Sequence, residues 1–258
     1  MGQNYSTSNI TETHTYGWKR ELPDHNDTYH TFIQSEIEHE LIDLRKYCPP
    51  IYNQGNLGSC TANAVAGAYE YQDDTENKPD IMPSRLFIYY NEREIENTVR
   101  SDSGATIRDS IKAVFKYGIC SEKLWPYQIE KFIYKPPDVC YQQAKNNKIK
   151  QYKKINQTVN DMKSCLRQGL PFIFGFSVYE SFESENVAKT GTMTIPEKGE
   201  KLLGGHAVMA VGYIENEQRF IIRNSWGEHW GDHGYFYMPY EFVTNNLYAS
   251  DFWTIIKV

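Results

Sequence analysis

The sequence predicts an α+β fold of two lobes, a helical lobe and an antiparallel, β-barrel-like lobe, with a cleft between them. Before residue 150, apolar side chains recur at helical spacing, whereas short apolar runs bounded by turn residues dominate after residue 170. Hydrophobic residues make up 40% of the 258 residues, enough for a sizeable buried core. We therefore place the helical lobe at about residues 53–150 and the β lobe at about residues 151–258.

Helices are predicted mainly in the first half of the chain. The first follows Cys60 and is rich in alanine. The second has Ser84 as its N-cap, and the third covers residues 105–117 and stops at Gly118. A further short helix is predicted over residues 158–168, where the β lobe begins.

Strand patterns follow this last helix. They combine apolar and β-branched residues between turn residues, at residues 171–179, 206–214, 219–224, 235–238 and 251–258. Residues 41–52 are predicted to form an extended segment that leads into the helical lobe and is stopped by Pro49 and Pro50.

Composition excludes some classes of function. A net charge of −6 and a pI near 5.7 argue against nucleic acid as a partner. The five cysteines are widely spaced and contain no CxxC pair, which disfavours both a zinc site and a disulfide framework. We expect no metal or other cofactor, and a reducing compartment.

Cys60 is the candidate nucleophile. It lies where the turn Gly58-Ser59 gives way to the alanine-rich helix, so its side chain is expected at a helix N-terminus. Unpaired backbone N–H groups and the positive end of the helix dipole favour the thiolate there, and the thiolate is the form that attacks a carbonyl carbon.

His206 and Asn224 are the candidate partners of Cys60. His206 stands at the head of an apolar strand 146 residues after Cys60, and Asn224 ends the next strand 164 residues after it. The order Cys, His, Asn and this spacing are typical of one class of thiol enzymes. Because the cysteine belongs to the helical lobe and the other two to the β lobe, the three side chains must meet across the cleft.

The chain resembles the papain/cathepsin family of cysteine peptidases, in the variety found in bacteria and large DNA viruses. The resemblance covers roughly residues 42 to 258. It rests on Gln54-Gly55 with Gly58-Ser59-Cys60, Gly205-His206-Ala207-Val208, Asn224-Ser225-Trp226-Gly227, Trp230-Gly231 and Gly234-Tyr235. It implies the two-lobed papain-like fold and a cysteine endopeptidase.

The resemblance also implies roles for single residues. Cys60 would form an acyl-enzyme thioester, His206 would act as acid and base, Asn224 would orient His206, and Gln54 would donate to the oxyanion. Four further residues would contact substrate or shield the site: Ser103, Gly104, Gly205 and Trp226. His229 and His233 compete with His206, but we interpret them as surface residues.

Two positions depart from the family pattern. Thr61 follows the nucleophile where an aromatic residue is usual, and Leu57 stands where the family has a second cysteine. The first departure leaves the nucleophile intact, and the second removes a disulfide partner.

Residues 1–40 precede the expected peptidase domain, residues 41–258. Trp18 and other aromatic side chains of this leader would be exposed to solvent in an unpacked tail, so we expect the leader to pack on the peptidase domain. One hypothesis is a propeptide that obstructs the substrate groove and makes the chain a zymogen. The alternative is a permanent structural strap.

The N-terminus carries neither a secretory signal nor an apolar run, so we expect a cytoplasmic or, for a viral protein, a virion-associated location. The first six residues fit the N-myristoylation pattern with Gly2 as acceptor, and a membrane would be a partner only if Gly2 is acylated.

Two alternatives to a peptidase remain open at this point. One is an acyltransferase that uses the same Cys/His/Asn apparatus, and the other is a catalytically silent peptide-binding homologue. Asparagine as third member and Gln54 favour the peptidase, and a silent homologue would be expected to have lost Cys60 or His206. We expect a monomer whose partners are peptide or protein substrates and its own N-terminal segment.

Overall fold

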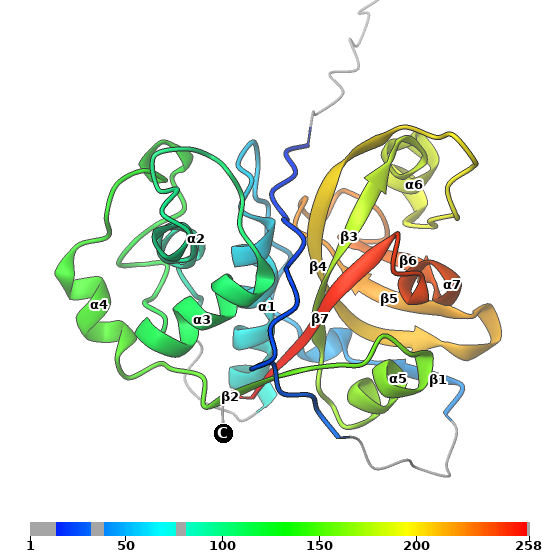
Figure 1. Cartoon of the computed structure of the whole chain (residues 1–258), viewed down its shortest axis with the longest axis horizontal. Coiled ribbons are helices and arrows are strands. Elements are labelled where there is room, and N and C mark those ends of the chain that lie inside the picture. Colours follow the sequence, from blue (N-terminus) through cyan, green and yellow to red (C-terminus); the bar gives the residue numbers. More distant parts are fainter. Residues whose placement is uncertain (1–13, 32–38, 76–80, 257–258) are drawn as a thin grey trace, which may run out of the picture.

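The computed structural model describes residues 14–31, 39–75 and 81–256, and its two halves differ in secondary structure (Figure 1). Helices gather on one side and an antiparallel sheet on the other, so the predicted α+β class is confirmed. Residues 14–31, here called the N-terminal strap, run along the junction of the two halves. The predicted acylation site, Gly2, lies outside the described residues.

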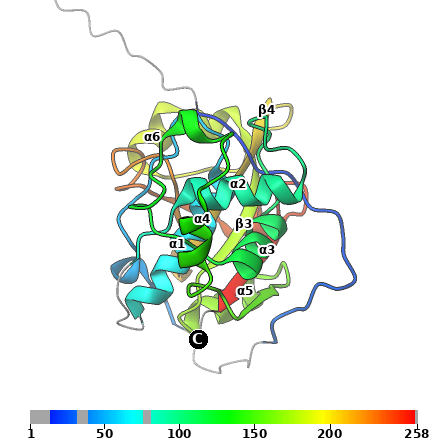
Figure 2. The same ribbon diagram turned by 90° about the vertical axis from the view of Figure 1, so that its left-hand side faces the viewer.

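The helical half contains α1 to α4, which lie in front of the sheet when the molecule is turned by 90° (Figure 2). The hydroxyls of Ser84 and Thr106 cap the second and third of these helices by accepting a backbone N–H in the first turn. The first three helices were predicted and the fourth was not. The bounds are α1 Cys60–Thr75, α2 Arg85–Ile95, α3 Ile107–Tyr117 and α4 Asp138–Ala144.

The described strands form one antiparallel sheet in the order β2-β7-β3-β4-β5-β6, with β1 paired to β4. Its outer strands, β2 and β6, do not pair with each other within the described part of the chain, so the sheet is open and not a closed barrel. The bounds are β1 Leu41–Asp43, β2 Gln151–Lys154, β3 Phe172–Tyr179, β4 Leu202–Ile214, β5 Arg219–Arg223, β6 Tyr235–Pro239 and β7 Ala249–Ile256.

The remaining helices are short and flank the sheet. They are α5 Val159–Arg167, α6 Glu185–Thr190 and α7 Tyr240–Thr244, with 3-10 turns η1 Arg45–Tyr47, η2 Ile129–Lys131, η3 Glu180–Glu183 and η4 Glu215–Glu217. Of these, only α5 was predicted. Across the described residues, no helix has the length and apolar character needed to cross a membrane.

Helix α1 packs directly on the sheet, and this contact places the N-terminus of the helix beside β4. Small buried residues such as Ala62 and Ala66 allow the close approach. A Cβ added at Gly67 would lie 3.3 Å from Nε of Arg223. That guanidinium in turn donates to the carbonyls of Pro49 and Pro50, so it joins the helix, the sheet and the lead-in segment.

Candidate active site

Cys60 is the first residue of α1 and is completely buried. Backbone N–H groups of Ala207 and Gly17 donate to its sulfur, and so does that of Thr61. Burial nevertheless raises the pKa of the Cys60 thiol to about 11, because the charged form loses its solvation. The thiolate expected at a helix N-terminus is therefore not favoured while the sulfur is covered.

His206 and Asn224 meet as the sequence predicted. Nε2 of His206, on β4, lies 2.7 Å from Oδ1 of Asn224, the residue after β5. Nδ1 of His206 has no hydrogen-bond partner among the described residues, so it is the nitrogen left for chemistry. Burial lowers the pKa of His206 to about 4. The ring is thus neutral in this structure at pH 7.

Trp226 covers the histidine. Its ring stacks on that of His206 with a centroid distance of 4.8 Å and an interplanar angle of 24°. The other two histidines of this region, His229 and His233, are exposed. The structure therefore brings His206, and neither of its competitors, to Asn224 and Trp226.

Gln54 is buried and held from both sides. Its Oε1 accepts a hydrogen bond from the hydroxyl of Ser225 at 2.7 Å, which fixes the orientation of the side-chain amide. Nε2 then donates to the carbonyl oxygens of Leu57 at 2.9 Å and of Thr15 at 3.1 Å. Because Thr15 belongs to the N-terminal strap, the amide proposed to bind an oxyanion already holds a peptide carbonyl.

The N-terminal strap crosses the cleft at Cys60. Its backbone bonds both lobes: Ala105 N–H donates to Gly17 O at 2.9 Å, and Trp18 N–H donates to Gly205 O at 3.0 Å. A Cβ built on Gly17 would lie 1.8 Å from the carbonyl oxygen of Gly58, and one built on Gly104 would lie 1.9 Å from that of Gly17. Backbone packs on backbone here, and only glycine fits at either position.

The predicted substrate-contacting residues are thus mostly covered by the strap. Gly104 and Gly205 both touch it, whereas the Ser103 hydroxyl donates to the carbonyl of Gly104. At the first described residue of the strap, three positions before Gly17, His14 stacks on Trp226 with a centroid distance of 3.7 Å. His14 also pairs with Glu183 at 2.9 Å.

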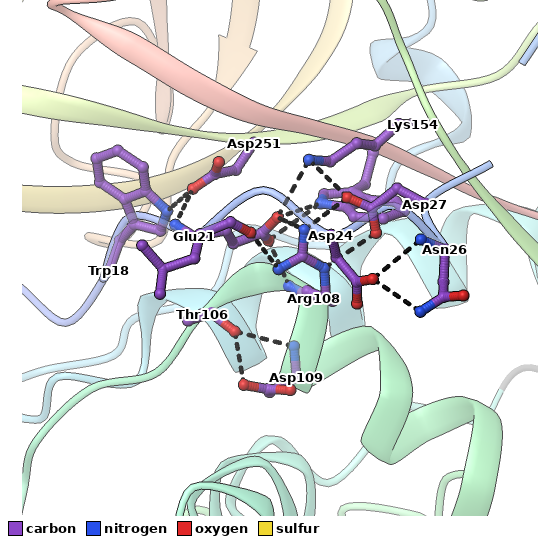
Figure 3. A network of polar contacts seen from close by, with 12 residues as sticks. Trp18, Glu21, Asp24, Asn26, Asp27, Thr106, Arg108, Asp109, Lys154 and Asp251 are labelled. Atoms are coloured by element: carbon purple, nitrogen blue, oxygen red, sulfur yellow. Dashed lines mark hydrogen bonds and ion pairs between the residues drawn. The ribbon is translucent and has the colours of Figure 1, made fainter. Parts of the chain in front are cut away.

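A buried network of charged residues anchors the part of the strap that follows Trp18 in the chain (Figure 3). Glu21 accepts hydrogen bonds from the Arg108 backbone N–H at 2.7 Å and from the Trp253 indole at 3.0 Å. The Arg108 guanidinium and Lys154 also pair with Asp27, at 2.6 and 2.9 Å. Sequence reasoning missed this network, because its partners come from distant segments of the chain.

Thr61 stands where an aromatic residue was expected from the family pattern, and its hydroxyl has a specific hydrogen-bond partner. Its hydroxyl donates to Oε1 of Glu92 on α2 at 2.7 Å. The Glu92 side chain is fully buried, and burial raises its pKa to about 8. The residue next to the nucleophile is thus tied to a carboxyl group that holds its proton at pH 7.

The site brings together the thiol of Cys60, the imidazole of His206, whose Nδ1 is unpaired in the described part of the chain, and the side-chain amide of Gln54. The N-terminal strap covers this site. Within the residues that the structure describes, no group of three His, Cys, Asp or Glu side chains could hold a metal ion.

The sequence of the chain is similar to those of known cysteine proteases. A sequence model of the papain family cysteine proteases matches residues 39–249. An uncharacterized peptidase C1-like protein of Acanthamoeba polyphaga mimivirus is 43% identical over 96% of this chain and 88% of its own length. The oryzain gamma chain of Oryza sativa subsp. japonica is 27% identical over 73% of this chain and 51% of its own length.

Two solved structures resemble the protein, one in sequence and fold and the other in fold alone. The crystal structure of xylellain, a cysteine protease from Xylella fastidiosa, superposes with a TM-score of 0.89 at 43% identity, covering 94% of this chain and 96% of that one. Digestive procathepsin L 3 from the Tenebrio molitor larval midgut, at 18% identity, shares the fold with a TM-score of 0.69 over 90% of this chain and 74% of its own.

Proposed function

Because the chain belongs to the papain family of cysteine proteases, we propose that it cleaves internal peptide bonds through a thioester on Cys60. The observation that carries the proposal is the bond of 2.7 Å between His206 Nε2 and Asn224 Oδ1. It leaves the Nδ1 nitrogen of a buried imidazole unpaired, on the strand whose next residue, Ala207, donates to the sulfur of Cys60.

In the first half of the reaction, the Cys60 sulfur attacks the carbonyl carbon of the peptide bond. His206 Nδ1 carries the proton from the thiol and delivers it to the amine that leaves, so that a thioester and a new N-terminus form. In the second half, water attacks the thioester and gives a proton to His206 Nδ1, which passes it to the departing sulfur of Cys60. The products are the free thiol and a carboxylic acid, which ionises in solvent.

Two residues are proposed to support these steps. Asn224 accepts the N–H of His206 at Nε2 and so fixes the ring tautomer and its orientation. Gln54 donates its side-chain N–H to the oxygen that becomes negative in each tetrahedral intermediate. The present bond from Gln54 to the carbonyl of Thr15 supports this role, because a peptide carbonyl is the group that the amide would meet in a substrate.

We further propose that the chain is made in a latent form in which the N-terminal strap obstructs the cleft of a peptidase domain at residues 41–258. The complete burial of Cys60 and His206 supports latency, because a substrate carbonyl has no path to the sulfur. The raised pKa of Cys60 and the lowered pKa of His206 also favour the unreactive neutral pair.

The test compares the full-length chain with its Gly17→Ala variant on a panel of internally quenched peptides. A methyl group at Gly17 meets the carbonyl oxygen of Gly58 at 1.8 Å, so the strap cannot dock at Cys60. We expect little hydrolysis by the unaltered chain, thiol-dependent hydrolysis by Gly17→Ala, and none by Gly17→Ala combined with Cys60→Ala. Equal hydrolysis with and without Cys60 would refute the mechanism, and equal hydrolysis with and without Gly17→Ala would refute latency.

A further inference from the structure

A tyrosine hydroxyl bridges the two ends of the turn that leads from Gln54 to Cys60. Tyr127 lies between α3 and η2, and its hydroxyl donates to the backbone carbonyl of Gln54 at 2.9 Å. The same oxygen lies 2.5 Å from the hydroxyl oxygen of Ser59, the residue before the nucleophile. One side chain from outside the turn therefore bonds the residue of the proposed oxyanion donor to the neighbour of Cys60.

The direction of these hydrogen bonds is fixed by the groups at their ends. The carbonyl of Gln54 can only accept, so Tyr127 donates its single hydroxyl proton there and accepts from Ser59. Burial raises the pKa of Tyr127 to about 12, so the phenol keeps this proton at pH 7. Ser59 in turn accepts from Nδ2 of Asn63 on α1 at 3.0 Å.

Arg85 on α2 determines which way the amide of Asn63 points. Its guanidinium donates to Oδ1 of Asn63 at 3.3 Å, and a guanidinium cannot accept, so Nδ2 is the atom that faces Ser59. The Arg85 side chain is buried, pairs with Glu122 at 3.4 Å and lies 4.1 Å from the centre of the Tyr127 ring. A chain of donors therefore runs in one direction, in the order Arg85, Asn63, Ser59, Tyr127 and Gln54.

The backbone of Gln54 has one described hydrogen bond to each lobe. Its N–H donates to the carbonyl of Ser225 at 2.9 Å, and the Ser225 hydroxyl holds the side-chain amide from the same side. Because Ser225 follows Asn224, these bonds place Gln54 relative to the histidine and asparagine of the β lobe. The bond from Tyr127 is the link to the helical lobe, where Cys60 begins α1.

Given the proposed peptidase function, we propose that Tyr127 is a positioning residue for the oxyanion donor: its hydroxyl holds Gln54 in register with the nucleophile across the cleft. Tyr127 acts through Gln54 and not on the substrate itself. An amide must lie within about 0.5 Å of its productive place to stabilise an oxyanion, so this link matters in the transition state. Without the hydroxyl, the Gln54 carbonyl loses a donor and Ser59 loses an acceptor, while the aromatic ring still packs on Arg85.

The first experiment is a double-mutant cycle in the Gly17→Ala chain on one quenched peptide. Tyr127→Phe should lower kcat at least about fivefold and leave KM within about twofold, because it displaces a donor that acts in the transition state. With Gln54→Ala also present, the same change should alter kcat by less than about twofold, since no amide remains to be placed. A purely structural role would give the same fold-change in both backgrounds.

Tyr71→Phe is the matched control. The Tyr71 ring is buried near the other end of α1, and its hydroxyl also donates to a backbone carbonyl at 2.9 Å, that of Gly169. We expect this variant to leave kcat unchanged within about twofold. Circular dichroism and urea titrations check that all variants are folded.

The second experiment uses the full-length chain and needs no hydrolysis. In the closed chain the Gln54 amide holds the carbonyl of Thr15, and the buried Cys60 is alkylated by iodoacetamide only when the strap opens. Tyr127→Phe should raise the alkylation rate at least about threefold, as expected for a weakened hydrogen bond, and by less than about 1.5-fold when Gln54→Ala is present. Mass spectrometry of the Cys60 peptide gives each rate.

The outcomes of the two cycles separate the two proposals. Equal fold-changes with and without the Gln54 amide in either cycle, or no effect of Tyr127→Phe on alkylation, would overturn the role of Tyr127 and leave the peptidase function in place. If no Gly17→Ala chain shows hydrolysis that depends on Cys60, the peptidase function fails. The alkylation cycle then decides alone whether Tyr127 places Gln54.

Discussion

The side-chain amide of Gln54 donates a hydrogen bond to the carbonyl oxygen of Thr15 at 3.1 Å. Thr15 lies two residues before Gly17, whose backbone N–H donates to the Cys60 sulfur. The N-terminal strap therefore supplies a peptide carbonyl to Gln54 and a peptide N–H to Cys60, which are the two groups that we propose act on a substrate once the strap has left.

Replacing Gln54 by alanine in the Gly17→Ala chain should lower kcat by about 10²-fold with little change in KM. Removing one oxyanion donor has an effect of this size because the lost bond strengthens as charge develops in the transition state. Steady-state kinetics on one quenched peptide measures both constants. Gln157→Ala is the matched control, since that amide also donates to two backbone carbonyls, those of Val243 and Ala249, and its loss should leave kcat unchanged.

Asn224→Ala should lower kcat by at least about tenfold in the same background. Without the acceptor at Nε2, the His206 ring loses the bond that fixes its tautomer and orientation. Asn224→Asp keeps an acceptor and should retain more activity than Asn224→Ala. An Asn224→Ala chain that is fully folded and has an unchanged kcat would show that Trp226 stacking alone orients the ring.

Glu21 should make docking of the strap depend on pH. Burial and the neighbouring Asp251 raise the pKa of docked Glu21 to about 7, well above the value of a released glutamate. Docking therefore takes up a proton, so Glu21 favours the closed form below about pH 4.5 and this contribution is lost as pH rises through 7.

Cys60 alkylation as a function of pH measures this effect. The rate ratio of Glu21→Gln to the unaltered chain should rise as pH falls from 7.5 to 5, by at most about tenfold per unit. Taking the ratio cancels the opposite contribution of His206, whose pKa is lowered in the closed form. Asp24→Asn, at a half-buried position of the same strap, should give a flat ratio, because the hydrogen bond from the Asn26 backbone lowers the pKa of Asp24 and the carboxyl is ionised throughout this range. A flat ratio for Glu21→Gln would contradict the assignment.

Glu92→Gln should stabilise the fold at high pH relative to the unaltered chain. Folded Glu92 keeps its proton up to about pH 8, so its contribution to stability is complete below the ordinary glutamate pKa and is lost as pH rises through 8. Between pH 5 and 9, the free energy of unfolding of the unaltered chain should fall by at least about 1 kcal/mol more than that of the variant. Urea titrations measure it, with Glu94→Gln on the same helix as control.

Much of the fold could be predicted because periodicity and capping residues are local. Ser84 and Gly118, the predicted cap and stop, mark the start of α2 and the end of α3, and β3 to β7 lie within a few residues of their predicted positions. The family, in its bacterial and viral variety, is confirmed by the relatives at 43% identity. The short elements β1, β2, α4, α6 and α7 escaped prediction because a few residues cannot establish a period.

The parts of the site that escaped prediction depend on contacts between distant segments. Asp251 has no motif around it, and its hydrogen bond from Trp18 joins residues that lie 233 positions apart in the chain. The thiolate form of Cys60 is expected from its place at the helix N-terminus, which takes no account of burial. The strap adds burial, which reverses the direction of the pKa shift and which no pattern around Cys60 could reveal.

The most direct measurement is the rate at which an active-site-directed epoxide modifies Cys60 in three full-length chains, followed by intact mass. Gly17→Ala should be modified at least about tenfold faster than the unaltered chain, because its strap cannot dock against Gly58. Leu22→Ala, which truncates an exposed side chain of the strap, should match the unaltered chain. Equal rates in all three would contradict a latent peptidase closed by its own N-terminal strap.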